Sequence, residues 1–215
     1  MTIARHSIVF GVCSLGLTLL ATMASERAAS AGPDTNTVAS LYGADTNRAG
    51  AADWFPEAWK ATCASSEAVT GISQATTQAY VKSALCSTQA GLTAGASVTL
   101  NVTAENRRAK RIADWDHDFY KAECALNEYV SGVAQSPSTS NAAFKGIRCT
   151  AAPPGVSYAS NCETHVAGTD DRGTQAVGDW EHGFYKTECA AGKVVVGASK
   201  STTTDKFHRI LCCGR

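Results

Sequence analysis

The sequence predicts an all-β fold, a disulfide-stapled β-prism of twelve strands with approximate threefold symmetry. One set of residues recurs three times: an Asp-Trp pair, a cysteine nine positions after the tryptophan, and a glycine eight positions after that cysteine. A second cysteine closes each copy 23, 25 and 23 residues after the first. Apolar and polar residues alternate between these markers, without helical periodicity. The chain therefore uses one β-structured unit three times.

The repeats span about residues 37–95, 96–157 and 158–215 and form a single domain within residues 32–215. The recurring residues are Asp53, Trp54, Cys63, Gly71 and Cys86 in the first copy, Asp114, Trp115, Cys124, Gly132 and Cys149 in the second, and Asp179, Trp180, Cys189, Gly197 and Cys212 in the third.

Residues 1–31 have the features of a secretory signal peptide. Arg5 and His6 precede an apolar stretch over residues 8–23, and small residues follow at 29–31. The apolar stretch is shorter than the roughly 20 residues that span a bilayer. We expect cleavage and secretion, with Cys13 leaving in the signal peptide.

The eight remaining cysteines form an even set in a chain sent to an oxidising compartment, which predicts four disulfides. Equivalent cysteines should pair equivalently, while Cys189 could pair with either Cys212 or Cys213. Phe207 precedes Cys212 by five residues, as Phe144 precedes Cys149, and this favours Cys212. The predicted pairs are Cys63 with Cys86, Cys124 with Cys149, Cys189 with Cys212, and Cys162 with Cys213. No C-x-x-C spacing indicates zinc, and no metal or cofactor is predicted.

Each repeat is predicted to contain four strands. The first lies upstream of the Asp-Trp pair, at residues 38–42, 97–102 and 163–166, and leads into a polar turn that contains arginine. The second ends at the opening cysteine, as in 119–124 and 184–189. Its aromatic residue, Trp59, Tyr120 or Tyr185, lies on the same side as that cysteine.

The third strand occupies residues 68–72, 129–133 and 194–198 and contains the repeated glycine, which predicts a bulge or the close approach of another backbone. The fourth carries the closing cysteine, as in 144–149 and 207–212. Twelve strands with threefold symmetry fit a β-prism or a β-trefoil. The tryptophans are 61 and 65 residues apart, which is long for a trefoil and favours the prism.

The Trp-to-Cys spacing, the Gly146-Ile147-Arg148-Cys149 ending and the terminal Cys212-Cys213 pair resemble the vitelline membrane outer layer protein family over most of residues 37–215. The resemblance implies a threefold β-prism in extracellular coats, with carbohydrate contact. The chain lacks the family's acidic segment before the last strand of a repeat and has residues 138–141 and 202–205 there instead. A looser resemblance connects it to dermatopontin.

Charge excludes some partners. Nineteen basic and nineteen acidic residues cancel, and no basic stripe with interleaved aromatic residues predicts nucleic-acid binding. The basic run Arg107, Arg108, Lys110 and Arg111 is interpreted as a solvated turn. No amphipathic segment predicts membrane insertion after signal cleavage.

Catalytic motifs are weak. His117 and His182 follow the second and third tryptophans and adjoin Asp116 and Glu181, which allows acid–base pairs or metal ligands. A polar turn at a strand entry explains the same residues. No nucleophile elbow occurs, and an even number of paired cysteines leaves no free thiol.

We therefore predict a secreted, non-catalytic protein that binds an extracellular glycan or belongs to a surface coat. Each Asp-Trp pair with its arginine turn offers the aromatic and polar groups that bind sugars, although the same tryptophans could instead cap the core. The candidate ligand-binding residues are Asp53, Trp54, Asp114, Trp115, His117, Asp179, Trp180 and His182. The alternatives are a glycan-modifying enzyme centred on the histidines and an inhibitor-type or toxin-type interaction protein.

Overall fold

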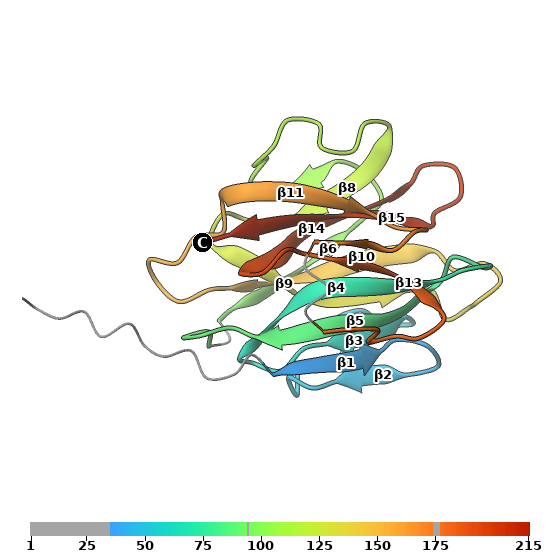
Figure 1. Cartoon of the computed structure of the whole chain (residues 1–215), viewed down its shortest axis with the longest axis horizontal. Helices are drawn as coiled ribbons and strands as arrows, with labels where there is room; N and C mark the ends of the chain where they lie inside the picture. Colours follow the sequence, from blue (N-terminus) through green and yellow to red (C-terminus); the bar gives the residue numbers. More distant parts are fainter. Residues whose placement is uncertain (1–34, 94, 174–176) are drawn as a thin grey trace, which may run out of the picture. The chain divides into compact units, whose positions relative to one another are not determined.

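Three five-stranded sheets build the fold in the computed structural model, which describes residues 35–93, 95–173 and 177–215 (Figure 1). These residues belong to one compact unit. The expected signal peptide, with Cys13, lies outside the described residues. The described ranges contain no helix, and therefore no helix long and apolar enough to cross a membrane.

The described residues form fifteen strands, so the expected number of twelve is wrong. The three additional strands lie in the arginine-containing turns and pair in parallel with the strand after the Asp-Trp loop: β2 with β3, β7 with β8, and β12 with β13. They were not foreseen because two or three polar residues have no recognisable strand pattern.

The first sheet has the order β1-β5-β4-β13-β12, the second β2-β3-β9-β10-β6, and the third β11-β15-β14-β8-β7. The bounds are β1 Asn36–Ser40, β2 Asp45–Asn47, β3 Trp59–Thr62, β4 Glu67–Ala75, β5 Val81–Thr88, β6 Ser97–Asn101, β7 Asn106–Arg107, β8 Phe119–Glu123, β9 Glu128–Gln135, β10 Phe144–Ala151, β11 Ser160–Val166, β12 Asp171–Arg172, β13 Phe184–Glu188, β14 Lys193–Ser201 and β15 Phe207–Gly214.

Each sheet combines strands from two repeats. The first repeat places β2 and β3 in the second sheet, the second repeat places β7 and β8 in the third, and the third repeat places β12 and β13 in the first. Figure 1 shows this last exchange, with β13 beside β4 although more than 100 residues separate them. The strand exchange is thus cyclic, and a repeat is not a self-contained sheet.

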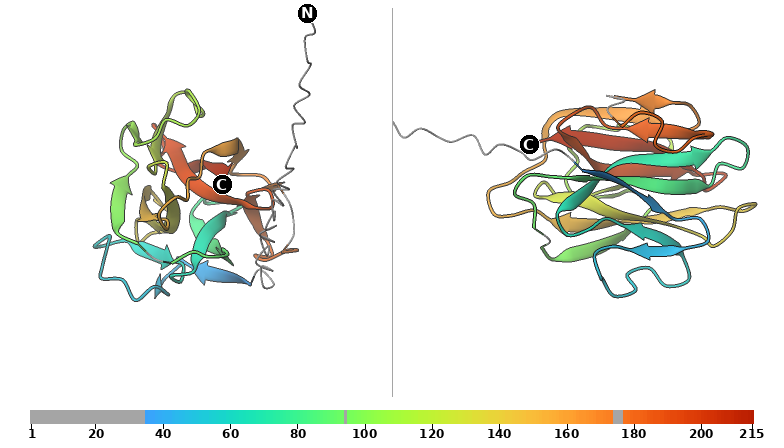
Figure 2. Two further views of the ribbon diagram at one scale, coloured as in Figure 1. Left: turned by 90° about the vertical axis from the view of Figure 1, so that its left-hand side faces the viewer. Right: turned by 60° about the horizontal axis from the view of Figure 1, so that its bottom comes forward.

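The core lies between the three sheets (Figure 2). The central strands β4, β9 and β14 contact one another pairwise. Their inward side chains are β-branched or small, which suits close packing on a pleated surface. Equivalent residues from the three repeats meet there: Val69, Ile72, Val130, Val133, Val195 and Ala198.

The four disulfides join the pairs expected from the repeat, with Cys212 rather than Cys213 bonded to Cys189. Cys63 follows β3 of the second sheet, whereas Cys86 lies in β5 of the first. The equivalent disulfides link the third sheet to the second and the first sheet to the third. Each closes a loop worth about 3 kcal/mol of unfolded-state entropy, so all three contacts between sheets are covalently secured.

Both expected causes of the repeated glycine, a bulge and the close approach of another backbone, are present in the structure. Strand register shifts beside it in each repeat. A Cβ on Gly132 would lie 2.8 Å from the carbonyl oxygen of Ala61 and 3.1 Å from Cζ2 of Trp54. Gly71 and Gly197 meet Trp180 and Trp115 in the same way. The tryptophan of one repeat therefore packs on the glycine of another, and this packing requires that the position have no side chain.

Candidate functional site

The three Asp-Trp loops share one geometry, and a buried lysine holds each of them. Asp53, Asp114 and Asp179 lie 2.8, 2.8 and 2.7 Å from the Nζ atoms of Lys60, Lys121 and Lys186. A second acid from the preceding turn approaches each lysine: Asp45, Glu105 or Asp170. Each lysine also donates hydrogen bonds to two loop carbonyls.

In the second repeat these contacts raise the pKa of the buried lysine and lower the pKa of the aspartate. Burial lowers the pKa of Lys121, but hydrogen bonds to Asp114 and Glu105 outweigh it and the pKa is raised. The hydrogen bond from Lys121 likewise holds the pKa of Asp114 below its ordinary value. The expected site aspartates are therefore half of a repeated structural ion pair, and that pair fixes the Asp-Trp loop.

The tryptophans face the protein rather than solvent. Trp54 Nε1 donates to Thr62 Oγ1 at 2.9 Å, and Trp180 Nε1 donates to Glu188 Oε2 at 3.3 Å. Trp115 is only 6 % exposed, and its buried Nε1 has no partner among the described residues. This placement agrees with the core-capping explanation of the three tryptophans.

The two histidines do not pair with the acids that precede them, Asp116 and Glu181. His117 is exposed and lies 2.8 Å from Asp118. Asp116 is instead buried and accepts hydrogen bonds from Ser199 and His208. In the third repeat the equivalent acid, Glu181, accepts a hydrogen bond from Ser83, whereas His182 is exposed. The expected pairs Asp116–His117 and Glu181–His182 are not formed.

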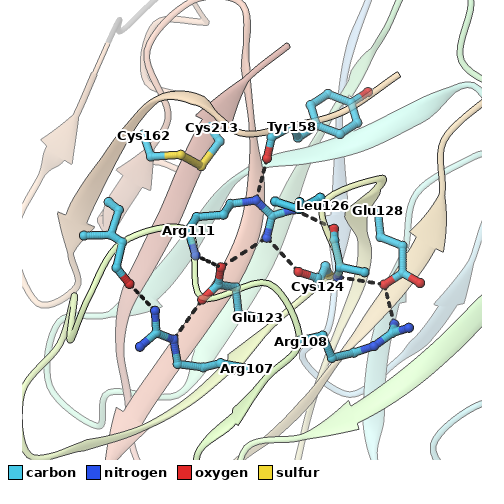
Figure 3. Close-up of polar contacts among 12 residues, drawn as sticks. Arg107, Arg108, Arg111, Glu123, Cys124, Leu126, Glu128, Tyr158, Cys162 and Cys213 are labelled. Atoms are coloured by element: carbon cyan, nitrogen blue, oxygen red, sulfur yellow. Dashed lines mark hydrogen bonds and ion pairs between the residues drawn. A yellow bond between two sulfur atoms is a disulfide. The ribbon is translucent and has the colours of Figure 1, made fainter. Parts of the chain in front are cut away.

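The basic run is not a fully solvated turn, so that interpretation is wrong for two of its four residues. Figure 3 shows Arg107 and Arg111 converging on Glu123. The three side chains are 7, 1 and 0 % exposed. Arg111 also donates to the carbonyl oxygens of Cys124 and Tyr158. Burial lowers the pKa of Arg111, while Glu123 acts in the opposite direction.

A further ionic cluster surrounds Glu163 on β11. Its carboxylate accepts hydrogen bonds from Lys193 and the backbone N–H of Ala190 and lies 3.0 Å from His165 Nε2. Burial raises the pKa of Glu163, but these partners outweigh burial and lower it to about 2.

Acid titration tests this cluster. A carboxyl whose folded-state pKa is lowered contributes stability above its unfolded pKa and loses it as pH falls through the folded value. Glu163 should therefore lose its contribution between pH 4.5 and about 2. We expect Glu163→Gln to be less stable at pH 7 and to lose less stability over that interval, measured by denaturant unfolding. Glu57→Gln, at an exposed carboxylate outside any ion pair of the described residues, is the control. An unchanged pH dependence in Glu163→Gln would contradict the assignment.

Hollows are present in the described part of the chain. An open hollow of about 690 Å³ beside Lys121 is lined by Glu105, Asp114 and Phe119. Smaller cavities of about 130 and 70 Å³ occupy matching places on the first and second sheets. Hydrogen-bonded hydroxyl pairs line both, Thr70 with Ser87 and Ser131 with Thr150. The hydroxyl groups of these two pairs therefore satisfy one another.

Two groups of sulfur and carboxylate atoms have the spacing of metal ligands: Cys63, Cys86 and Glu67, and Cys124, Cys149 and Glu128. The sulfurs are in disulfides, whereas a thiolate is the form that binds metal. The carboxylates of Glu67 and Glu128 accept hydrogen bonds from Arg48 and Arg108. Both groups are thus disulfides held beside ion pairs.

An aromatic patch lies where one end of the first sheet meets Trp59 of β3 in the second sheet, and it was not predicted from the sequence. We use this name for Tyr42, Trp59, Tyr80 and Phe184 together with Lys82. The Tyr42 ring centroid lies 5.4 Å from those of both Trp59 and Tyr80, and Tyr80 lies 6.4 Å from Phe184. Tyr42 is 46 % exposed, and the other three aromatic residues are half-buried.

The complete patch has no counterpart in the other two sheets, although Trp59 corresponds to Tyr120 and Tyr185. The backbone N–H groups of Leu41, Val102 and Ala167 donate to Lys82, Lys145 and His208, which establishes the equivalent positions. The residues equivalent to Tyr42 are then Thr103 and Gly168, those equivalent to Tyr80 are Ala143 and Lys206, and those equivalent to Phe184 are Ala58 and Phe119. Tyr42 and Tyr80 are therefore the rings that the other two sheets lack, whereas Trp59, like Tyr120, packs against the core.

Comparison with known proteins does not identify a family: no family model, no curated protein and no solved structure matches the chain.

Proposed function

We propose that the protein is an extracellular, non-catalytic carbohydrate-binding protein whose binding surface is the aromatic patch. Four disulfides indicate an extracellular protein. The observation that carries the proposal is the presence of four clustered rings at a single one of three equivalent positions. Membership in the vitelline membrane outer layer protein family forms part of the proposal, and the three-sheet fold is the one that the resemblance implies.

The physical basis is the match between aromatic rings and sugar rings. A pyranose has one face of C–H groups, which stacks on the electron-rich face of an aromatic ring, while its hydroxyl groups bind polar neighbours. Tyr42 and Tyr80 each provide an apolar ring with a hydroxyl group, and Lys82 provides a hydrogen-bond donor. Their contacts with Trp59 and Phe184 hold the rings in place, which limits the entropy lost on binding.

The geometry of the acids and histidines supports binding rather than catalysis. A glycosidase of the usual kind needs two carboxyl groups on either side of the scissile bond. Each exposed aspartate of the Asp-Trp loops is bound to a buried lysine instead. His117 pairs with the exposed carboxylate of Asp118, and neither histidine pairs with the acid that precedes it.

Substitution of Tyr42 tests the proposal. We expect Tyr42→Ala to weaken binding to a responsive glycan about fivefold, because a stacked ring contributes on the order of 1 kcal/mol. The melting temperature should change little, since the side chain is half exposed. The measurement is a glycan-array screen followed by calorimetric titration. Thr103→Ala, at the equivalent position of the second repeat, is the control. Undiminished binding by Tyr42→Ala would contradict the proposed site.

A further inference from the structure

The charge at the centre of the aromatic patch is not neutralised by an acid. Lys82 Nζ lies 4.8 Å from the ring centroid of Tyr42 and 5.8 Å from that of Phe184. Among the described residues, no carboxylate lies within ion-pair distance of this ammonium group. The buried lysines Lys60 and Lys121, by contrast, each contact two acids.

A ligand on the patch would therefore meet rings and a positive charge together. Aromatic faces attract an ammonium group but do not cancel its charge, so Lys82 retains its capacity to bind an anion. Stacking alone would not distinguish neutral from charged sugars, whereas a charge-assisted hydrogen bond would.

We propose that the aromatic patch recognises glycans that carry an anionic group, a uronate carboxylate or a sulfate ester, with Lys82 as the residue that binds the anion. This inference rests on the proposed carbohydrate-binding function and adds the class of ligand.

The position of one acid near the patch, Glu181, indicates on which side an anionic group would bind. Glu181 accepts a hydrogen bond from Ser83, the residue after Lys82. Burial raises the pKa of Tyr80, and the charges of Tyr42 and Glu181 add to that increase. Because Glu181 is engaged by Ser83 and does not contact Lys82, the anion of a ligand would bind on the Lys82 side of the patch, away from this carboxylate.

The experiment compares polygalacturonate, heparin and neutral dextran as ligands for the full secreted chain and three variants. Lys82→Gln removes the charge at the patch and keeps a polar side chain of similar length. Lys145→Gln removes the equivalent charge from the second sheet, where no aromatic patch surrounds it. Tyr42→Ala removes a ring and keeps Lys82. Calorimetric titration is performed at two salt concentrations, and thermal unfolding verifies that each variant is folded.

We expect at least one polyanion to bind more tightly than dextran. Lys82→Gln should weaken that binding about tenfold and reduce its salt dependence, whereas Lys145→Gln should leave both unchanged. Tyr42→Ala should weaken binding of every glycan that binds. The uronate and sulfate arms identify which anion is preferred.

Three results would overturn the inference. Equal losses in Lys82→Gln and Lys145→Gln would show nonspecific attraction of polyanions to surface charge. Tyr42-dependent binding of dextran that matches or exceeds binding of both polyanions would exclude anion recognition while leaving the proposed function intact. Absence of Tyr42-dependent binding to all three glycans would overturn the inference, and the glycan-array screen would then decide whether the proposed function falls with it.

Discussion

Replacing Glu123 with threonine is expected to lower the free energy of unfolding by about 3 to 5 kcal/mol, because the change leaves buried charge without a partner. Arg107 and Arg111 both contact this carboxylate, and all three side chains are almost fully excluded from solvent. The Glu123 carboxylate also accepts a hydrogen bond from the backbone N–H of Arg111, which the substitution removes. Urea denaturation followed by intrinsic fluorescence measures the loss.

A control variant can be designed from the first repeat, which has no buried Arg–Glu pair at this position. Asn47 and Thr62 stand there in place of the Arg–Glu pairs of the other repeats, and Thr62 accepts the hydrogen bond from Trp54. In the third repeat, the double variant Arg172→Asn, Glu188→Thr reproduces this uncharged pair. It should be more stable than Glu188→Thr alone. If both variants lose equal stability, the cost does not come from the uncompensated charge.

Truncating Trp115 to alanine should also cost about 3 to 5 kcal/mol, the range for a large aromatic side chain in a core. Trp115 packs on the third sheet in an apolar cluster with Tyr158, Val196 and Leu211. The position of a Cβ on Gly197 lies only 3.4 Å from its Cζ2 atom. The cavity left by alanine could not be filled by the glycine. Thermal and denaturant unfolding measure the effect.

Phenylalanine separates packing from hydrogen bonding at the same position. Because Nε1 of Trp115 has no partner among the described residues, Trp115→Phe should recover much of the stability lost in Trp115→Ala. Trp54→Phe should be relatively worse, because it deprives Thr62 Oγ1 of its donor. Equal losses in the two phenylalanine variants would contradict this distinction.

Local regularities allowed much of the fold to be predicted. The cysteine spacing identified the four disulfides, and the alternating pattern identified the long strands. The same spacing could not show which strands pair, since hydrogen bonds between strands of different repeats leave no mark in a single sequence. The cyclic exchange was missed for this reason, and the parallel strands β2, β7 and β12 were missed because two or three polar residues show no strand pattern.

The candidate site was predicted less well because repetition marks residues that the fold needs. The Asp-Trp pairs recur because they bind a buried lysine and a distant glycine, and the structure shows these contacts in all three repeats. Tyr42 and Tyr80 have no aromatic equivalents, and comparison of the repeats for aromatic residues that occur once could have identified them.

The exchange of strands around the ring of sheets has a consequence for biosynthesis. The first sheet lacks its β12 and β13 strands until almost the entire chain has been made, because these strands end at Arg172 and Glu188. A nascent chain of one or two repeats would present an open sheet edge, a surface prone to mispairing. Assembly is therefore expected to wait for the last repeat and then to occur in one concerted step. A protein with only two repeats would need strands from a second polypeptide to complete the ring of sheets.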